Sequence, residues 1–288
     1  MYWLIVFHPG EPLQPHDLWT AWNGEISLLL LLLILVLAYG WGVHTLWRSA
    51  GAGRGIQKRP VLAFAGAILA LAVALISPLD ALSAALFSAH MLQHLLLMLV
   101  AAPLLVLSRI PLALLWAFPR RWVRVSGQWV RQAEWRMQTA QMLASPILAW
   151  VLFSLALWVW HAPSIYQAAL ELEPVHALEH AMLLVTAVLF WSVPLSAVRR
   201  SPAHYARAIP FLFLTGLHSG VLGALMTFSA APWYPYYAGR VSAWGLTLLQ
   251  DQQLAGLFMW LPGGAVFTGL TIWFFSAWFR GIEQRSQN

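Results

Sequence analysis

Residues 25–47 read EISLLLLLLILVLAYGWGVHTLW, with a single charged side chain, Glu25, at the start of the run. A helix needs about 20 consecutive apolar residues to cross a hydrocarbon core about 30 Å thick. The stretch therefore predicts a membrane-spanning helix. Six further apolar runs follow, near residues 61–79, 84–108, 143–162, 175–197, 208–229 and 251–279. Together they predict an all-α polytopic membrane protein, a bundle of seven transmembrane helices.

The composition excludes most soluble protein classes. Hydrophobic residues make up 60% of the 288 residues and charged residues only 9%, whereas a typical soluble domain is about 25% charged. The net charge is +6, but the basic residues lie in short loops, so we expect no nucleic-acid surface. The absence of cysteine excludes thiolate ligands, disulfides and iron–sulfur clusters. Any bound metal must therefore use His, Met or carboxylate ligands.

The basic residues lie on one side of the predicted bundle. With seven spans, fifteen of the sixteen Lys and Arg residues follow odd-numbered spans, and Arg240 is the exception. Because positive charge marks cytoplasmic loops, we expect the N-terminus outside and the C-terminus inside. The acidic residues near the outer ends are Glu11, Asp17, Glu25, Asp80, Glu171, Glu173, Glu179 and Asp251. The expected organisation is a periplasmic tail (1–24), a membrane domain (25–280) and a cytoplasmic tail (281–288).

One segment of the membrane domain has a different character. Residues 119–140 interleave Trp122, Trp129 and Trp135 with arginines. This pattern is typical of a helix that lies on the cytoplasmic headgroups. A solvated loop is the alternative.

Histidines on four predicted spans, and one aspartate on a fifth, gather toward the outer side of the bundle. Two pairs are spaced four residues apart on one span, so each pair shares one face of its helix. Ionisable residues inside spans are rare and by default mark function. The candidate metal ligands are His90, His94, His161, His176, His180, His218 and Asp251. The histidines assigned to structural or surface roles are His8, His16, His44 and His204.

These residue types restrict the metal. Imidazole without thiolate suits copper or zinc, with iron possible. Four methionines fall in the outer halves of spans, namely Met91, Met182, Met226 and Met259. Thioether favours Cu(I), but methionine is also an ordinary packing residue, and packing is our interpretation for each of them. Glu179 and Gln93 are expected to orient the ligands by hydrogen bonding to them, without contacting the metal.

The string His176-x-x-Glu179-His180 also matches the inverted zinc-protease signature. That mechanism needs a further zinc ligand and a glutamate that activates water. The only acids downstream are Asp251 and Glu283, and the latter is cytoplasmic by the predicted topology. Proteolysis is therefore a minor alternative, and we expect a protein that is not an enzyme.

Six stretches between residues 77 and 264 carry a resemblance to a known family. They are Ser77-Pro78-Leu79-Asp80, His90-Met91-Leu92-Gln93-His94, Trp160-His161-Ala162-Pro163, His176-Ala177-Leu178-Glu179-His180, Asp251-Gln252-Gln253-Leu254-Ala255-Gly256 and Met259-Trp260-Leu261-Pro262-Gly263-Gly264. With them the chain resembles the CtaG assembly factors of caa3-type cytochrome c oxidase, which are seven-helix bacterial membrane proteins. The residues that match the family pattern are His90, His94, His161, His176, His180 and Asp251, whereas His218 rests on its position alone.

The resemblance implies an assembly factor, or chaperone, that supports metallation of a haem–copper oxidase. We expect it to hold copper near the outer side of a bacterial inner membrane, with an oxidase subunit as partner and a copper donor as a possible second one. Zinc and haem remain alternative ligands. The rival functions are a haem-binding redox protein of cytochrome b type and a His-lined metal or proton transporter.

Overall fold

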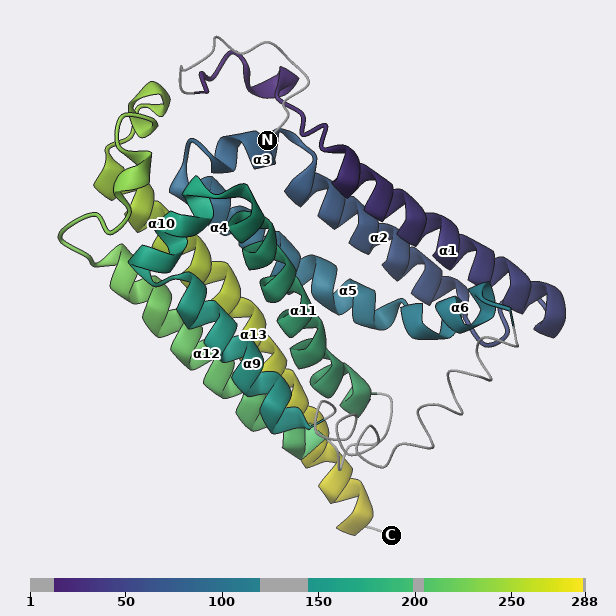
Figure 1. The fold of residues 1–288 in the computed structure, drawn as a ribbon. Coiled ribbons are helices and arrows are strands. Elements are labelled where there is room, and N and C mark those ends of the chain that lie inside the picture. Colours follow the sequence, from purple (N-terminus) through teal and green to yellow (C-terminus); the bar gives the residue numbers. More distant parts are fainter. Residues whose placement is uncertain (1–12, 120–144, 199–204, 287–288) are drawn as a thin grey trace.

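The computed structural model describes residues 13–119, 145–198 and 205–286, and in these ranges the regular structure is helical, as predicted (Figure 1). The elements are η1 (Leu18–Thr20), α1 (Ile26–Ala50), α2 (Lys58–Leu75), α3 (Pro78–Ser83), α4 (Phe87–Leu95), the π-helical segment η2 (Leu96–Ala101), α5 (Ala102–Leu107), α6 (Ile110–Ala117), α9 (Pro146–Trp160), α10 (Pro163–Glu171), α11 (Glu173–Val198), α12 (Tyr205–Thr227), η4 (Pro235–Tyr237), η5 (Val241–Trp244) and α13 (Leu248–Ser286). The segment expected at the headgroups, 119–140, lies outside the described residues except for its first position, as does most of the N-terminal tail.

Six of the helical units are long and apolar enough to cross a membrane. They are α1, α2, the continuous run from α4 through α5, α11, α12 and α13. The predicted fourth span corresponds to α9, which meets α10 at a 76° bend and counts as a seventh span only together with it. Pro163 at the start of α10 explains the break, since a residue before proline avoids the helical conformation and Ala162 is extended. The bend leaves His161 at the end of α9.

The helices form two groups that α4 and α5 connect. In Figure 1, α1 and α2 run side by side with α6 against α1, and α12 pairs with α13 near α9 and α11. The run from α4 to α5 starts against α13, continues against α11 and also contacts α2. The helix α4 is therefore surrounded by other helices and largely buried.

Two glycines allow α12 and α13 to approach closely. A Cβ atom at Gly223 would lie 2.9 Å from the carbonyl oxygen of Gly256, and one at Gly256 would lie 2.6 Å from that of Gly223. Small residues at such crossings let membrane helices pack backbone to backbone. The contact fixes the beginning of α13, and with it the position of Asp251.

The π-helical segment interrupts the helix directly after the histidines of α4. A π-helix pairs each carbonyl with the amide five residues later. For Met98 that residue is Pro103, which has no N–H to donate. The indole N–H of Trp191 on α11 donates to the Met98 carbonyl instead, at 2.7 Å. This bond ties α4 and η2 to α11, so it holds together the two helices that carry the paired histidines.

Candidate metal centre

The two histidine pairs lie opposite each other, one pair on α4 and the other near the start of α11. The ring centroid of His180 lies 5.6 Å from that of His90 and 5.2 Å from that of His94. His176 is equally close, with its centroid 5.3 Å from that of His90. The i, i+4 spacing of each pair turns both rings to one helix face. Two helices thus supply four imidazoles to one location.

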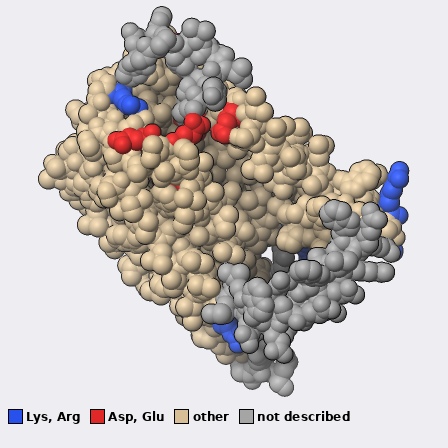
Figure 2. Space-filling view, viewed as in Figure 1, with Lys and Arg blue, Asp and Glu red and all other residues tan. Residues whose placement is uncertain are grey.

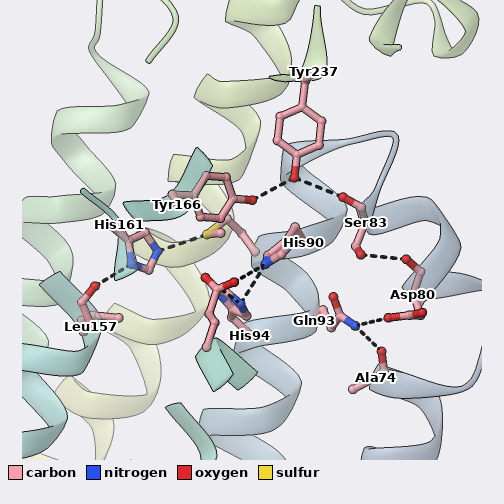
Figure 3. Close-up of polar contacts among 12 residues, drawn as sticks. Ala74, Asp80, Ser83, His90, Gln93, His94, Leu157, His161, Tyr166 and Tyr237 are labelled. Atoms are coloured by element: carbon pink, nitrogen blue, oxygen red, sulfur yellow. Dashed lines mark hydrogen bonds and ion pairs between the residues drawn. The ribbon is translucent and has the colours of Figure 1, made fainter. Parts of the chain in front are cut away.

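Four residues can offer their ligand atoms to a single ion. His90, His176, Glu179 and His180 each present one nitrogen or oxygen, and these atoms all lie within 4.8 Å of one another. We call these four residues the ligand group. His94 lies beside them, with its Nε2 2.9 Å from His90 Nε2 and 3.6 Å from Glu179 Oε1 (Figure 3).

The ligand group contains buried polar atoms that have no hydrogen-bond partner among the described residues. They include both carboxylate oxygens of Glu179 and the Nε2 atoms of His176 and His180. Buried polar groups are almost always paired, so each such atom requires an explanation. A metal ion supplies one, because carboxylate oxygens and imidazole nitrogens are ligands of copper and zinc. The group therefore fits a metal ion, and Glu179 is a candidate ligand rather than the orienting residue that the sequence suggests.

A cavity of about 600 Å³ leads to the ligand group. Its lining includes His90, His176 and His180 together with four acidic residues, Glu25, Asp80, Glu171 and Glu173. Figure 2 shows acidic side chains gathered on one part of the surface, over the end of the molecule that carries α3 and α10 in Figure 1. The cavity can thus admit a cation past an acidic surface.

His161 faces this region from the bend after α9. Its Nδ1 lies 2.6 Å from the carbonyl oxygen of Leu157 and its Nε2 lies 3.3 Å from Met91 Sδ, as the dashed lines in Figure 3 show. Its ring centroid is 6.1 Å from that of His94. The structure therefore places His161 next to the paired histidines but outside the ligand group.

Asp251, a predicted metal ligand, has a different setting. Its carboxylate accepts hydrogen bonds from the backbone N–H of Phe87 at 2.6 Å, and from the N–H and hydroxyl of Ser88. These amides form the first turn of α4, and Leu86 at the N-cap position supplies no side-chain bond. A carboxylate at a helix N-terminus satisfies free amides and complements the helix dipole. We therefore reassign Asp251 from ligand to the cap that α13 provides for α4.

The structure also does not bring His218 into the ligand group. Its Nε2 is 3.0 Å from the hydroxyl of Ser154 and its Nδ1 accepts a hydrogen bond from Trp158. Both partners lie on α9, and His218 is half-buried on α12. The imidazole is thus paired between these two helices.

Gln93, the other residue predicted to orient the ligands, points away from the histidines. Its amide donates to the carbonyl oxygen of Ala74 at 2.6 Å and to Asp80 at 2.9 Å (Figure 3). Asn23 donates to the other oxygen of Asp80 at 2.9 Å. Burial raises the pKa of Asp80 to about 6, although both of these bonds oppose the shift. The network joins the segment before α1 to α4, the helix that carries His90 and His94.

Sequence reasoning missed this role of Asp80. Ser77 and Pro78 carry a local signal, because Ser77 accepts a hydrogen bond from the Leu79 amide as N-cap and Pro78 occupies the first turn. That signal places Asp80 in the first turn of a short helix. It does not identify Gln93 or Asn23 as partners, since both are distant in sequence.

The loop between α12 and α13 packs against the site. Tyr237 donates to the carbonyl oxygen of Ser83 and accepts from Tyr166, whose ring centroid is 5.2 Å from that of His90. Tyr234 donates to the carbonyl oxygen of His161 at 2.8 Å. Arg240, the exception to the charge pattern, lies 3.8 Å above the ring of Tyr236. No local sequence signal predicts these contacts.

Comparison with known protein families identifies the family of this chain. The model of the cytochrome c oxidase caa3 assembly factor family, Caa3_CtaG, matches residues 37–281. The chain belongs to this family. The match confirms the resemblance found in the sequence, and it covers every residue of the ligand group. No significant match was found among curated proteins or among solved structures.

Family membership supports a role in cytochrome c oxidase assembly, and the helices capable of crossing a membrane indicate a membrane protein. Membership of a cytochrome c oxidase assembly factor family implies that an oxidase is a partner. It does not identify the oxidase subunit. The ligand group is compatible with metal binding.

Proposed function

We propose that this Caa3_CtaG protein binds copper at the ligand group, on the outer side of a bacterial inner membrane, and passes it to a haem–copper oxidase subunit during assembly. One observation carries the proposal. Both carboxylate oxygens of Glu179 and the Nε2 atoms of His176 and His180 lie close together without a hydrogen-bond partner among the described residues, on a helix that the family match covers. Copper is cargo here, and the protein is a chaperone that binds without turnover.

The ligand chemistry suits an ion that must be held and then released. Three neutral imidazoles and one carboxylate give a site with one negative charge, so the carboxylate offsets part of the charge of copper in a low-dielectric setting. Zinc accepts the same ligands, so metal analysis distinguishes the two. With no cysteine in the chain, the ion is not held by thiolate.

The distribution of charge supports an outer location. Basic side chains lie toward the ends of the molecule opposite the acidic surface, apart from the one near the α12–α13 loop (Figure 2). Under the positive-inside rule the acidic surface and the cavity would then face the periplasm. Glu25, Glu171 and Glu173 line the same cavity as His176 and His180, so their charges would attract a cation that enters it.

The packing of the rings favours an ion over a haem. Haem iron is held by axial side chains on opposite faces of a large macrocycle. Here the rings pack directly against one another, with centroids 4.4 Å apart for His90 and His94 and 4.3 Å apart for His176 and His180. The arrangement leaves no plane for a porphyrin between them.

The test is the copper content of the full-length protein, purified from copper-replete cells, beside oxidase activity in the same cells. We expect bound copper in the wild type, and its loss together with oxidase activity in His176→Ala/His180→Ala. His44→Ala is the matched control, because His44 is exposed on α1 and should change neither. Wild-type protein that carries no copper would contradict the proposal.

A further inference from the structure

The protonation of His161 follows from its two neighbours. A neutral imidazole has one N–H donor and one acceptor nitrogen. The carbonyl oxygen of Leu157, 2.6 Å from Nδ1, can only accept a hydrogen bond. Nδ1 must therefore carry the proton, and Nε2 presents a lone pair. A doubly protonated ring would bury an unpaired charge, because His161 is only 3% exposed and its described contacts include no carboxylate.

The atom that faces this lone pair is also an acceptor. Met91 Sδ lies 3.3 Å from His161 Nε2, and Met91 is fully buried. A thioether has no hydrogen to donate. Two acceptor atoms thus face each other in a buried setting, and this contact becomes favourable when a cation lies between them.

The spacing of the two atoms suits a metal ion. With bonds of about 2.0 Å to nitrogen and about 2.3 Å to sulfur, a separation of 3.3 Å between the two ligand atoms corresponds to an angle of roughly 100° at the ion. That angle is close to tetrahedral. Sulfur and imidazole without carboxylate form a soft ligand set, which selects Cu(I) over harder divalent ions.

His94 lies between this pair and the ligand group. Its Nε2 is 3.6 Å from Glu179 Oε1, whereas its ring centroid is 6.1 Å from that of His161. Its Nδ1 is buried without a hydrogen-bond partner among the described residues. The described residues that line the cavity include members of the ligand group but neither Met91 nor His161. An ion from the cavity therefore meets the ligand group first.

We propose that Met91 Sδ and His161 Nε2 form a second, deeper copper position that is selective for Cu(I), with His94 shared between it and the ligand group. This second proposal rests on the proposed function, because it assumes that copper is the ion that the protein binds. It assigns Met91 a ligand role that its burial among apolar side chains does not suggest. The chain would then hold two copper ions in neighbouring settings, one of imidazole and carboxylate and one of imidazole and thioether.

The experiment loads the full-length protein in detergent with Cu(I) under anaerobic reducing conditions. Chelator competition gives the stoichiometry, and copper X-ray absorption reports whether sulfur is bonded to the metal. Met91→Leu is the test variant, since this exchange conserves volume and is usually tolerated in a core. Met226→Leu is the control, because Met226 is equally buried, on α12.

We expect two Cu(I) ions and a copper–sulfur signal in the wild type and in Met226→Leu, and one ion without that signal in Met91→Leu. Wild-type protein that binds Cu(I) without sulfur would overturn the second position while leaving the proposed function intact, as would a sulfur signal that persists in Met91→Leu. Wild-type protein that binds no copper would overturn both. Absence of the sulfur signal from the wild type overturns the second position even if Met91→Leu does not fold.

Discussion

Glu179 and Asp251 are both fully buried acids near the starts of membrane-spanning helices, yet their surroundings are opposite. Asp251 accepts two backbone N–H bonds and one hydroxyl bond at the start of α4. Glu179 has no hydrogen-bond partner on either oxygen among the described residues and is flanked by imidazoles. The protein supplies the hydrogen bonds that the Asp251 carboxylate needs. The Glu179 carboxylate can still bind a cation or a proton.

The difference shows that burial of an acid does not by itself indicate a metal ligand. What matters is whether the protein already supplies the donors that the carboxylate needs. A saturated carboxylate such as Asp251 stabilises the structure, and removing it should damage the fold. An unsaturated one such as Glu179 costs stability in the absence of an ion, and removing it should damage binding alone.

The largest expected effect is on metal affinity, when the two histidines of α4 that lie beside Glu179 are both replaced. Loss of a group that only orients a ligand lowers metal affinity about 10- to 100-fold, so replacing both His90 and His94 by Ala should lower it by roughly a thousandfold or more. Membrane insertion should survive, because alanine leaves no unpaired polar atom. Chelator competition measures the affinity, with His44→Ala as control. A double variant that keeps its metal would remove α4 from the site.

The next effect is on stability, and it separates the two carboxylates directly. Asp251→Ala leaves the amides of Phe87 and Ser88 buried without an acceptor, which should cost about 3–4 kcal/mol of the free energy of unfolding. Glu179→Gln should leave the unfolding free energy of the metal-free protein unchanged or higher. Thermal unfolding in detergent measures both. Equal losses of stability in the two variants would contradict the distinction between these carboxylates.

A third buried carboxylate, Asp80, should make the stability of the protein depend on pH. Its pKa is about 6 in the folded protein, against about 4 in an unfolded chain. The folded state therefore binds more protons between these values, and stability should fall as pH rises from about 4 to about 6, by about 3 kcal/mol at most. Unfolding followed across this window in the wild type and in Asp80→Asn tests the expectation. The variant should lose this pH dependence, and an unchanged profile would contradict the assignment.

The smallest expected effect concerns the acidic lining of the cavity. Glu171→Gln/Glu173→Gln removes two negative charges that attract an incoming cation. Metal uptake, measured by stopped flow, should slow about threefold at low salt and converge with the wild-type rate at high salt, because exposed charges are screened. Affinity at equilibrium should change little. A slower rate that persists at high salt would indicate a structural defect instead.

The sequence predicts the helices well because a long apolar run has few alternatives in a membrane. The runs near 25–47 and 175–197 match α1 and α11 within a few residues at each end. The run near 143–162 likewise contains α9, but the apolar pattern does not show the bend that Pro163 introduces before α10. Helical spacing also predicts that His90 and His94 share a face, as do His176 and His180.

The partners of each polar side chain could not be predicted in this way. Helical spacing gives the face of a residue on its own helix, but not which neighbouring helix that face meets. Asp251 meets the amides of α4, and His218 meets Ser154 and Trp158 on α9. Met91 looks like a packing residue in the sequence, and only the position of His161 reveals its sulfur as a potential ligand.

The most direct test of the central claim is a crystal structure of the copper-loaded protein with diffraction data recorded at the copper absorption edge. We predict an anomalous peak enclosed by the ligand atoms of His90, His176, Glu179 and His180. An anomalous peak at His218 or Asp251 instead would contradict the claim. Copper-loaded protein with no peak beside Glu179, and with both Glu179 oxygens hydrogen-bonded to protein groups, would contradict it as well.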